Sequence, residues 1–234
     1  MSKHVLLDND EHRDLRVITR RAAELGDEIM VTLTFPAEFR NVQAHYPIVF
    51  AKSPAGTFAP LALFGFKEKQ NLFLTAQGWE APYIPMMIER QPFFIGRGAN
   101  DQKVIHIDLD SPRVSRTEGE PLFREQGVNS EFLDRAGSIL VTIERGVAQT
   151  AGFVAALTEL NLLESFVIDL DSNGAQHRFA GFHALQEERL AKLGADALGR
   201  LHEKGYLQAI FMVVASMSNF RELAERVRRR PDVG

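Results

Sequence analysis

The sequence predicts an α+β fold in which a mostly antiparallel sheet region from the N-terminal half packs against helices from the C-terminal half. Short β-prone runs broken by turn residues follow one another between residues 29 and 110. From about residue 130 the apolar residues instead recur at helical spacing. No repeat, low-complexity segment or long linker interrupts the 234 residues, so a single domain is favoured.

The strand-rich part contains runs of β-branched and aromatic residues that we expect to form strands. They cover 29–35, 46–52, 59–66, 71–76 and 104–110. Residues 53–58 read Ser-Pro-Ala-Gly-Thr-Phe, which is typical of a hairpin loop because Pro and Gly supply special backbone angles. The two glycines within 95–100 indicate a turn, since their spacing fits neither standard phosphate-binding loop.

The helix-rich part begins with a helix that ends near residues 160–164. One apolar face of this helix is formed by Val147, Ala151, Val154 and Leu157. A hairpin is expected over 166–182, with Asn173-Gly174 at its tip in the manner of a type I′ turn.

Three further helices are expected after this hairpin. The first covers 186–194, and the glycine at its end favours termination there. The second is capped by Asp196 and ends at Gly205, and the third covers 206–220.

The chain is therefore divided by composition into three parts. Residues 1–28 form an N-terminal segment, 29–223 the main domain, and 224–234 a basic tail. Within the main domain, 29–125 is strand-rich and 126–223 helix-rich. Two domains that divide near residue 125 are the alternative.

Composition excludes several classes of function. Lys and Arg number 27 against 31 Asp and Glu, a net charge of −4, which argues against a general nucleic-acid partner. The absence of cysteine excludes disulfides and thiolate chemistry. No secretory signal is visible at the N-terminus, and the longest apolar block, 209–215, is too short to span a bilayer. A cytoplasmic protein without a transmembrane segment is the expectation.

The stretch 78–96 is the most unusual in composition, because it groups aromatic, methionine and proline residues around Glu89-Arg90. Its prolines limit any helix to about 86–89, since a residue that precedes proline is pushed toward extended geometry.

Four residues of this stretch are the candidate binding residues: Trp79, Tyr83, Arg90 and Phe93. Trp and Tyr bury large areas while keeping one polar atom for a partner, and Arg pairs with carboxylates or stacks on rings. An irregular core segment between sheet and helices is the other interpretation.

An alternative metal site involves His106 and Asp108, which alternate onto one face of an expected strand. A His-x-Asp pair with a distant His is the ligand set of non-haem Fe(II) oxygenases. His177, His183 or His202 would be the third ligand, and Fe(II) the cofactor. A strand with a solvated polar face explains the same pair without metal, and no cofactor is then expected.

A family resemblance rests on several runs in a fixed order. They are YPIVF at 46–50, PLALFGF at 60–66, the W…YIP…IERQPF run at 79–93, GFHALQEERLAKL at 181–193, and the run at 201–223. Together they resemble the SapC family of bacterial proteins from about residue 30 to residue 223. The resemblance implies an association with surface-layer proteins, beside proteins that resemble flavin-dependent halogenases, cupin-like oxygenases and outer-membrane receptors.

No catalytic motif stands out, so we expect a non-catalytic accessory protein that binds a protein or peptide partner in surface or outer-membrane processes. The partner would be a halogenase-like or cupin-like enzyme or an outer-membrane receptor system. An Fe(II)- and 2-oxoglutarate-dependent oxygenase, or a partner of an oxygenase or halogenase, is the alternative. A third class is an oligomeric structural component in which 209–217 packs between subunits.

Overall fold

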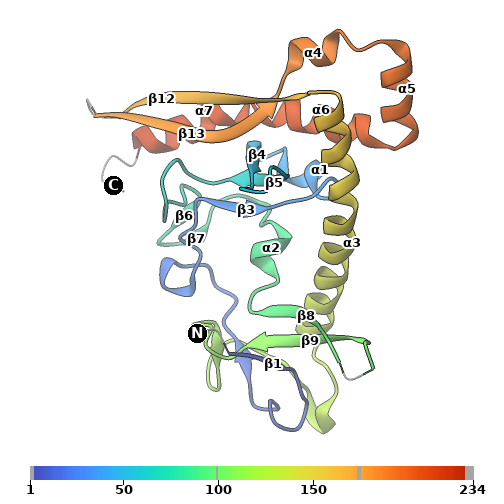
Figure 1. Cartoon of the computed structure of the whole chain (residues 1–234). Coiled ribbons are helices and arrows are strands. Elements are labelled where there is room, and N and C mark those ends of the chain that lie inside the picture. Colours follow the sequence, from blue (N-terminus) through green and yellow to red (C-terminus); the bar gives the residue numbers. More distant parts are fainter. Residues whose placement is uncertain (1–2, 99, 173–174, 230–234) are drawn as a thin grey trace. The chain divides into compact units, whose positions relative to one another are not determined.

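The computed structural model describes residues 3–98, 100–172 and 175–229, and the side chains of 170–177 lie outside this description. The chain divides into two compact units built from interleaved segments (Figure 1). Unit 1 comprises Met1–Glu28, Leu74–Glu80 and Met86–Arg145. Unit 2 comprises Ile29–Phe73, Ala81–Pro85 and Gly146–Gly234.

Unit 1 is built from small antiparallel sheets and short helical turns. A three-stranded sheet has the order β1 (His4–Leu6), β9 (Lys103–Asp108), β8 (Phe93–Arg97). A second has the order β10 (Val114–Ser115), β2 (Arg16–Val17), β11 (Glu120–Pro121), and β6 (Leu74–Thr75) pairs with β7 (Gly78–Trp79). The remaining elements are η1 (Ala23–Leu25), α2 (Met86–Glu89), η2 (Glu125–Gly127) and the first half of α3 (Glu131–Glu159).

The apolar core of unit 1 lies between the β1–β9–β8 sheet and the start of α3. Phe93 and Ile107 are directly paired across β8 and β9, and both are 0% exposed. Leu133 and Leu140 of α3 pack in the same cluster. Because successive strand residues alternate between faces, Phe94 and His106 lie on the opposite face of this sheet.

A buried ion cluster holds unit 1 together at Asp27, whose side chain is 0% exposed. Arg113 Nη2 lies 2.6 Å from Asp27 Oδ2, and Arg113 also donates to the carbonyls of Ile18 and Arg20. Arg21 Nη1 lies 3.4 Å from Asp27 Oδ1, and burial lowers the pKa of Arg21. A buried carboxylate requires such partners, so this cluster fixes the course of the N-terminal segment.

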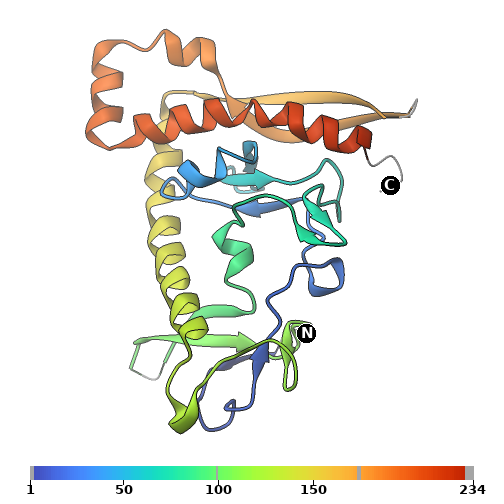
Figure 2. The same ribbon diagram turned by 180° about the vertical axis from the view of Figure 1, so that it is seen from behind.

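Unit 2 contains a five-stranded antiparallel sheet that joins strands from distant parts of the sequence. Its order is β12 (Leu163–Ser172), β13 (Ala175–Leu185), β4 (Ile48–Lys52), β5 (Phe58–Leu63), β3 (Val31–Leu33). The helices of this unit are α1 (Phe39–Val42), the second half of α3, α4 (Glu187–Ala191), α5 (Ala195–Glu203), α6 (Tyr206–Ser216) and α7 (Asn219–Arg229). Figures 1 and 2 both show α7 running beside the β12–β13 hairpin.

Aromatic rings fill the core of unit 2. Tyr46 makes edge contacts with Phe64 and Phe73, and Phe39 makes an edge contact with Phe153 of α3. Helix α6 docks on the sheet through buried apolar residues. The backbone N–H of Ile48 in β4 also donates to Ser216 Oγ at 2.9 Å. These contacts confirm an α+β fold in which N-terminal strands pack against C-terminal helices.

The expected strands at 29–35, 46–52, 59–66 and 104–110 are confirmed as β3, β4, β5 and β9, each with slightly different bounds. The hairpin loop between β4 and β5 is also confirmed, with Ser53 N–H donating to Thr57 O at 2.7 Å.

Two expectations about the strands are wrong. Residues 95–100 do not simply turn, because 93–97 form β8, which pairs with the distant β9. Of 71–76 only Leu74–Thr75 is a strand. Asn71 Oδ1 accepts a bond from Phe73 N–H, so a local side-chain bond takes the place of a ladder bond there.

The helix expectations are confirmed in outline and corrected at their ends. Helix α3 begins after Ser130, whose Oγ accepts from Leu133 N–H as an N-terminal cap does. Gly194, not Asp196, is the N-cap of α5, and Asp196 instead places a negative charge in the first turn. The tip of the 166–182 hairpin, Asn173-Gly174, lies outside the described residues.

The single helix expected over 206–220 is two helices. Helix α6 ends at Ser216 and α7 begins at Asn219. Ser216 Oγ donates to Val213 O and Ser218 Oγ to Ala215 O, and hydroxyls that bond to helix carbonyls in this way compete with the helix. The four-residue α2 agrees with the limit set by the prolines around it.

Candidate functional site

Two hollows in unit 2 lie on different sides of the C-terminal half of α3. We call the first the apolar groove; it has a volume of about 550 Å³ and runs between α3 and the start of β5. Its helix side is formed mainly by Val147, Ala151, Val154 and Ala155, and its strand side by Phe58, Ala59 and Pro60. The volume falls in the range of about 300–1,000 Å³ that is usual for ligand sites.

The strand side of the apolar groove is an incompletely paired edge. Strand β3 is at the end of the sheet and pairs with Leu61–Leu63 of β5. One more bond, from Thr34 N–H to Pro60 O, continues the ladder. In the described part of the chain, Phe58 and Ala59 therefore have a strand neighbour, β4, on one side only. Such an edge can accept a further extended segment.

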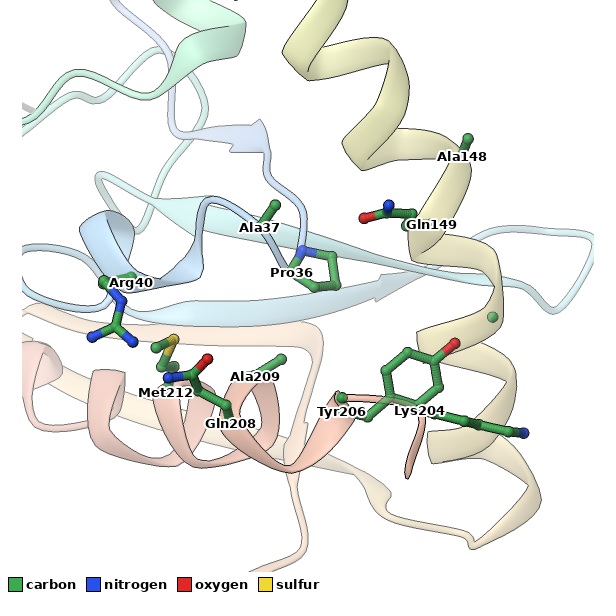
Figure 3. Close-up of a pocket in the computed structure, with 12 residues that line it drawn as sticks. Pro36, Ala37, Arg40, Ala148, Gln149, Lys204, Tyr206, Gln208, Ala209 and Met212 are labelled. Atoms are coloured by element: carbon green, nitrogen blue, oxygen red, sulfur yellow. The ribbon is translucent and has the colours of Figure 1, made fainter. Parts of the chain in front are cut away.

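We call the second hollow the cationic pocket; it has a volume of about 660 Å³. Figure 3 shows Arg40 beside Met212 at one end, and Tyr206 and Lys204 at the other end near α3. Gln149 reaches into the pocket from α3. Among its described lining residues there is no Asp or Glu, so the charges around it are all positive.

Tyr206 lies against α3 because a glycine faces it. A Cβ atom added at Gly152 would lie 2.6 Å from Tyr206 Oη, so a larger residue at this position would displace the ring. The ring also makes an edge contact with Phe153, with centroids 5.5 Å apart. Among the described residues of unit 2, none forms a hydrogen bond with the Tyr206 hydroxyl. This hydroxyl is therefore available to a ligand.

Three of the four sequence-predicted binding residues lie in unit 1. Trp79 is half-buried in β7, where it pairs with Leu74. Arg90 Nη1 donates to Phe93 O at 2.7 Å, and its guanidinium lies 4.4 Å from the ring centroid of Phe94. Burial lowers the pKa of Arg90. Phe93 is 0% exposed in the core, so its ring reaches no solvent.

Tyr83, the fourth of these residues, belongs to a buried hydrogen-bond network in unit 2. Its hydroxyl donates to Glu38 Oε1 at 2.8 Å, and Thr34 Oγ1 donates to Glu38 Oε2 at 2.7 Å. The hydroxyl of Tyr46 donates to the carbonyl of Tyr83. Glu38 is 1% exposed, so these donors satisfy a buried carboxylate. The hydrogen bond to buried Glu38 therefore explains the position of Tyr83 without a bound partner.

The residues of the alternative iron site have other contacts. His106 packs over Gly96, where an added Cβ would lie 2.4 Å from the imidazole, and Asp108 Oδ2 lies 3.8 Å from His4 Nε2. Among the described residues no group of three His, Asp or Glu could hold a metal ion. The side chain of His177 lies outside the described residues. Buried Nδ1 of His183 has no partner in the described part of the chain, and its ring contacts Phe58.

The expectation of no transmembrane segment stays a prediction. Among the described helices, α3 is long and apolar enough by length and composition to cross a membrane. Core helices pass the same criteria, and Glu144 and Arg145 lie in its middle.

Sequence reasoning missed both hollows. It predicted that Val147 and Ala151 share an apolar helix face with Val154 and Leu157. The latter two are buried, whereas Val147 is 49% exposed and opens onto the groove. The helical pattern is the same along this face, so the sequence does not distinguish its covered part from its open part.

The fold and its hollows define a mixed α+β protein with antiparallel sheets and two open hollows beside one long helix. The family model described as SapC matches residues 7–223. The chain therefore belongs to the SapC family. No curated protein and no solved structure matches it.

Proposed function

We propose that the protein is a non-catalytic accessory protein of the cytoplasm that binds an extended segment of a partner protein in the apolar groove. The observation that carries this proposal is the combination of an apolar lining with the free edge of β5. In this binding mode a peptide adds to the sheet edge, its backbone bonds to the strand, and alternate side chains enter the groove.

The chemistry of the lining supports a partner segment with apolar side chains. Val147 and Ala151 present small apolar surfaces from α3, and Phe58 presents a ring from β5. Thr150 Oγ1 donates to Gly146 O at 2.8 Å, and Thr57 Oγ1 shares a hydrogen bond with Ser53 Oγ at 2.7 Å. Each oxygen can still accept a hydrogen bond from a backbone N–H of the partner. An apolar lining with a few polar groups is the usual composition of a site that holds a ligand.

The partner class follows from the expected context of surface-layer or outer-membrane processes. A halogenase-like or cupin-like enzyme, or a component of an outer-membrane receptor system, is the partner that we propose. The second candidate surface is the one expected from the sequence, around Trp79, Tyr83 and Arg90. These three residues make contacts within the protein, which favours the groove as the binding surface. The two candidate surfaces predict different effects of substitution.

The test is affinity purification of the tagged full-length protein from its source cells, with wild type compared to Ala151→Glu. Ala151 is exposed, so the substitution places a charge in the groove without disturbing the core. Thr142→Glu is the matched control, because Thr142 is exposed on α3 and lines neither hollow.

We expect one stoichiometric partner with wild type and Thr142→Glu, and its loss with Ala151→Glu. If Ala151→Glu retains the partner in the same amount as wild type, the partner does not bind in the apolar groove. Recovery of the wild-type protein alone contradicts the accessory function itself.

A further inference from the structure

Phe58 is the first residue of β5, and it lines the apolar groove. We propose, building on the proposed function, that the backbone of Phe58 is the docking point of the partner segment. One residue of that segment exchanges two backbone hydrogen bonds with Phe58 and places an apolar side chain beside the Phe58 ring. This residue of the partner is not proline, because proline has no backbone N–H to donate.

The hydrogen bonds on the β4 side of β5 show which of its backbone groups point toward β4. Ser53 N–H donates to Thr57 O at 2.7 Å, and Leu63 N–H donates to Pro47 O at 3.0 Å. Bonded and non-bonded residues alternate along an antiparallel pair, so the odd-numbered residues of β5 bond to β4. The even-numbered residues, beginning with Phe58, therefore direct their N–H and C=O groups to the opposite side.

The hydrogen bonds on the β3 side agree with this alternation. Thr34 N–H donates to Pro60 O at 3.1 Å, and Phe64 N–H donates to Met30 O at 2.7 Å. Phe58 is the next even-numbered residue toward the start of β5, and the pairing with β3 does not extend to it. In the described part of the chain, the N–H and C=O of Phe58 therefore face the free edge without a strand partner.

The free edge at the groove is short. Thr34 lines the groove where the pairing with β3 ends, and Gly56, with φ of 85°, lies in the hairpin turn on the other side of Phe58. An antiparallel segment satisfies the donor and the acceptor of Phe58 with one residue, whereas a parallel segment needs two residues. The short edge therefore favours a segment that runs antiparallel to β5.

The partner residue opposite Phe58 carries the specificity of the groove. Directly opposed residues of an antiparallel pair point to the same face of the sheet, so its side chain lies beside the Phe58 ring. The helix side of the groove presents Val147 and Ala151, which are both exposed. These neighbours are apolar, so they select an apolar side chain, and a β-branched one suits the extended backbone.

The probe is the peptide acetyl-Thr-Val-Thr-Val-Thr-Val-Thr-amide, titrated into the full-length protein. Amide hydrogen exchange, followed by NMR, measures the protection of Phe58 N–H. We expect this amide to exchange rapidly in the free protein and about ten-fold or more slowly with the peptide bound, because it then lies in a hydrogen bond. Leu61 N–H, which faces β4, should be protected in both states and is the internal control. The same peptide with proline in place of each valine should not bind.

Phe58→Pro and Phe58→Ala separate the contribution of the backbone from that of the ring. Both substitutions remove the ring, but only proline removes the N–H, which the pairing with β4 does not use. The valine peptide should bind Phe58→Pro about three- to ten-fold more weakly than Phe58→Ala, as expected for loss of one hydrogen bond. The amide spectrum verifies that each variant is folded, and the exchange measurement on wild type does not depend on either variant.

The proposal is overturned if the valine peptide binds while Phe58 N–H exchanges as fast as in the free protein. It is also overturned if folded Phe58→Pro binds the peptide as well as Phe58→Ala, or if wild type does not bind the peptide at millimolar concentration. In each case, capture of a partner that is lost with Ala151→Glu would still support the groove as the binding site. Wild type that captures no partner from its source cells would instead contradict the proposed function.

Discussion

The two units of this chain use their polar and aromatic side chains differently. In unit 1, Asp27 and Arg113 are buried against each other, and Arg90 is held by Phe93 and Phe94. In unit 2, side chains of α3 line two open hollows, together with β5 at one and α6 at the other. The conspicuous residues Asp27, Arg90 and Arg113 therefore have internal partners, whereas the two hollows of unit 2 consist of residues that no motif identifies.

Substitution of Asp27 should have the largest effect on stability, because it removes the carboxylate from the buried ion cluster of unit 1. Asp27→Ala leaves Arg113, 1% exposed, without its carboxylate, and an uncompensated buried charge costs about 3–5 kcal/mol. We expect this loss in the free energy of unfolding, measured with urea by circular dichroism. Asp14→Ala, at an exposed acid of the same segment, should change it by less than about 0.5 kcal/mol. Equal effects of the two substitutions would show that the cluster contributes no special stability.

Arg90→Ala should give a smaller loss of stability. The substitution removes the bond to Phe93 O and the stacking on Phe94, together about 1–3 kcal/mol in the free energy of unfolding. Arg97→Ala is the control, because Arg97 is an exposed arginine of β8. Partner binding should be the same as for wild type in the purification experiment. Loss of the partner with unchanged stability would instead make Arg90 a binding residue, as the sequence predicts.

Substitutions in the apolar groove should have the smallest effect on stability and a large effect on binding. Ala151→Glu should change the free energy of unfolding by less than about 0.5 kcal/mol, since Ala151 is exposed. Thermal unfolding of the Ala151→Glu variant, compared with that of the Thr142→Glu control, measures this change in stability. A large loss of stability would mean that the groove is closed in solution and that Ala151 belongs to the core.

Trp79→Ala and Tyr83→Ala separate the two candidate surfaces. Tyr83→Ala should destabilise the fold, because Glu38 loses a hydrogen-bond donor in a buried site, at a cost of about 1–3 kcal/mol. Neither substitution should remove the partner while the protein stays folded. If either variant keeps the circular dichroism spectrum of wild type but captures no partner, the binding surface includes Trp79 or Tyr83 instead of the groove.

The parts of the fold that depend on nearby residues could be predicted from the sequence. Pro85 and Pro92 limit α2 to Met86–Glu89, and Gly205, with φ of 72°, separates α5 from α6. Strand β8 could not be predicted, because its glycine reads as a turn signal. In the structure, Gly96 instead provides room for the ring of His106 on the neighbouring strand.

The candidate sites could not be predicted for a related reason. A hollow is defined by which elements dock beside a helix face, and docking depends on contacts between distant residues. Val147 and Leu157 have the same helical pattern in the sequence, yet Leu157 is 0% exposed and Val147 is 49% exposed. Likewise, Arg40 and Lys204 are far apart in the chain and meet around one pocket only in the fold.

Site-specific photo-crosslinking in the source cells can show whether the partner occupies the apolar groove. A photoreactive phenylalanine analogue is placed at Val147 in the groove, with the same analogue at Thr142 and at Trp79 for comparison. We expect one crosslinked partner band with the analogue at Val147 and none at the other two positions. A band that forms at Trp79 and not at Val147 would contradict it.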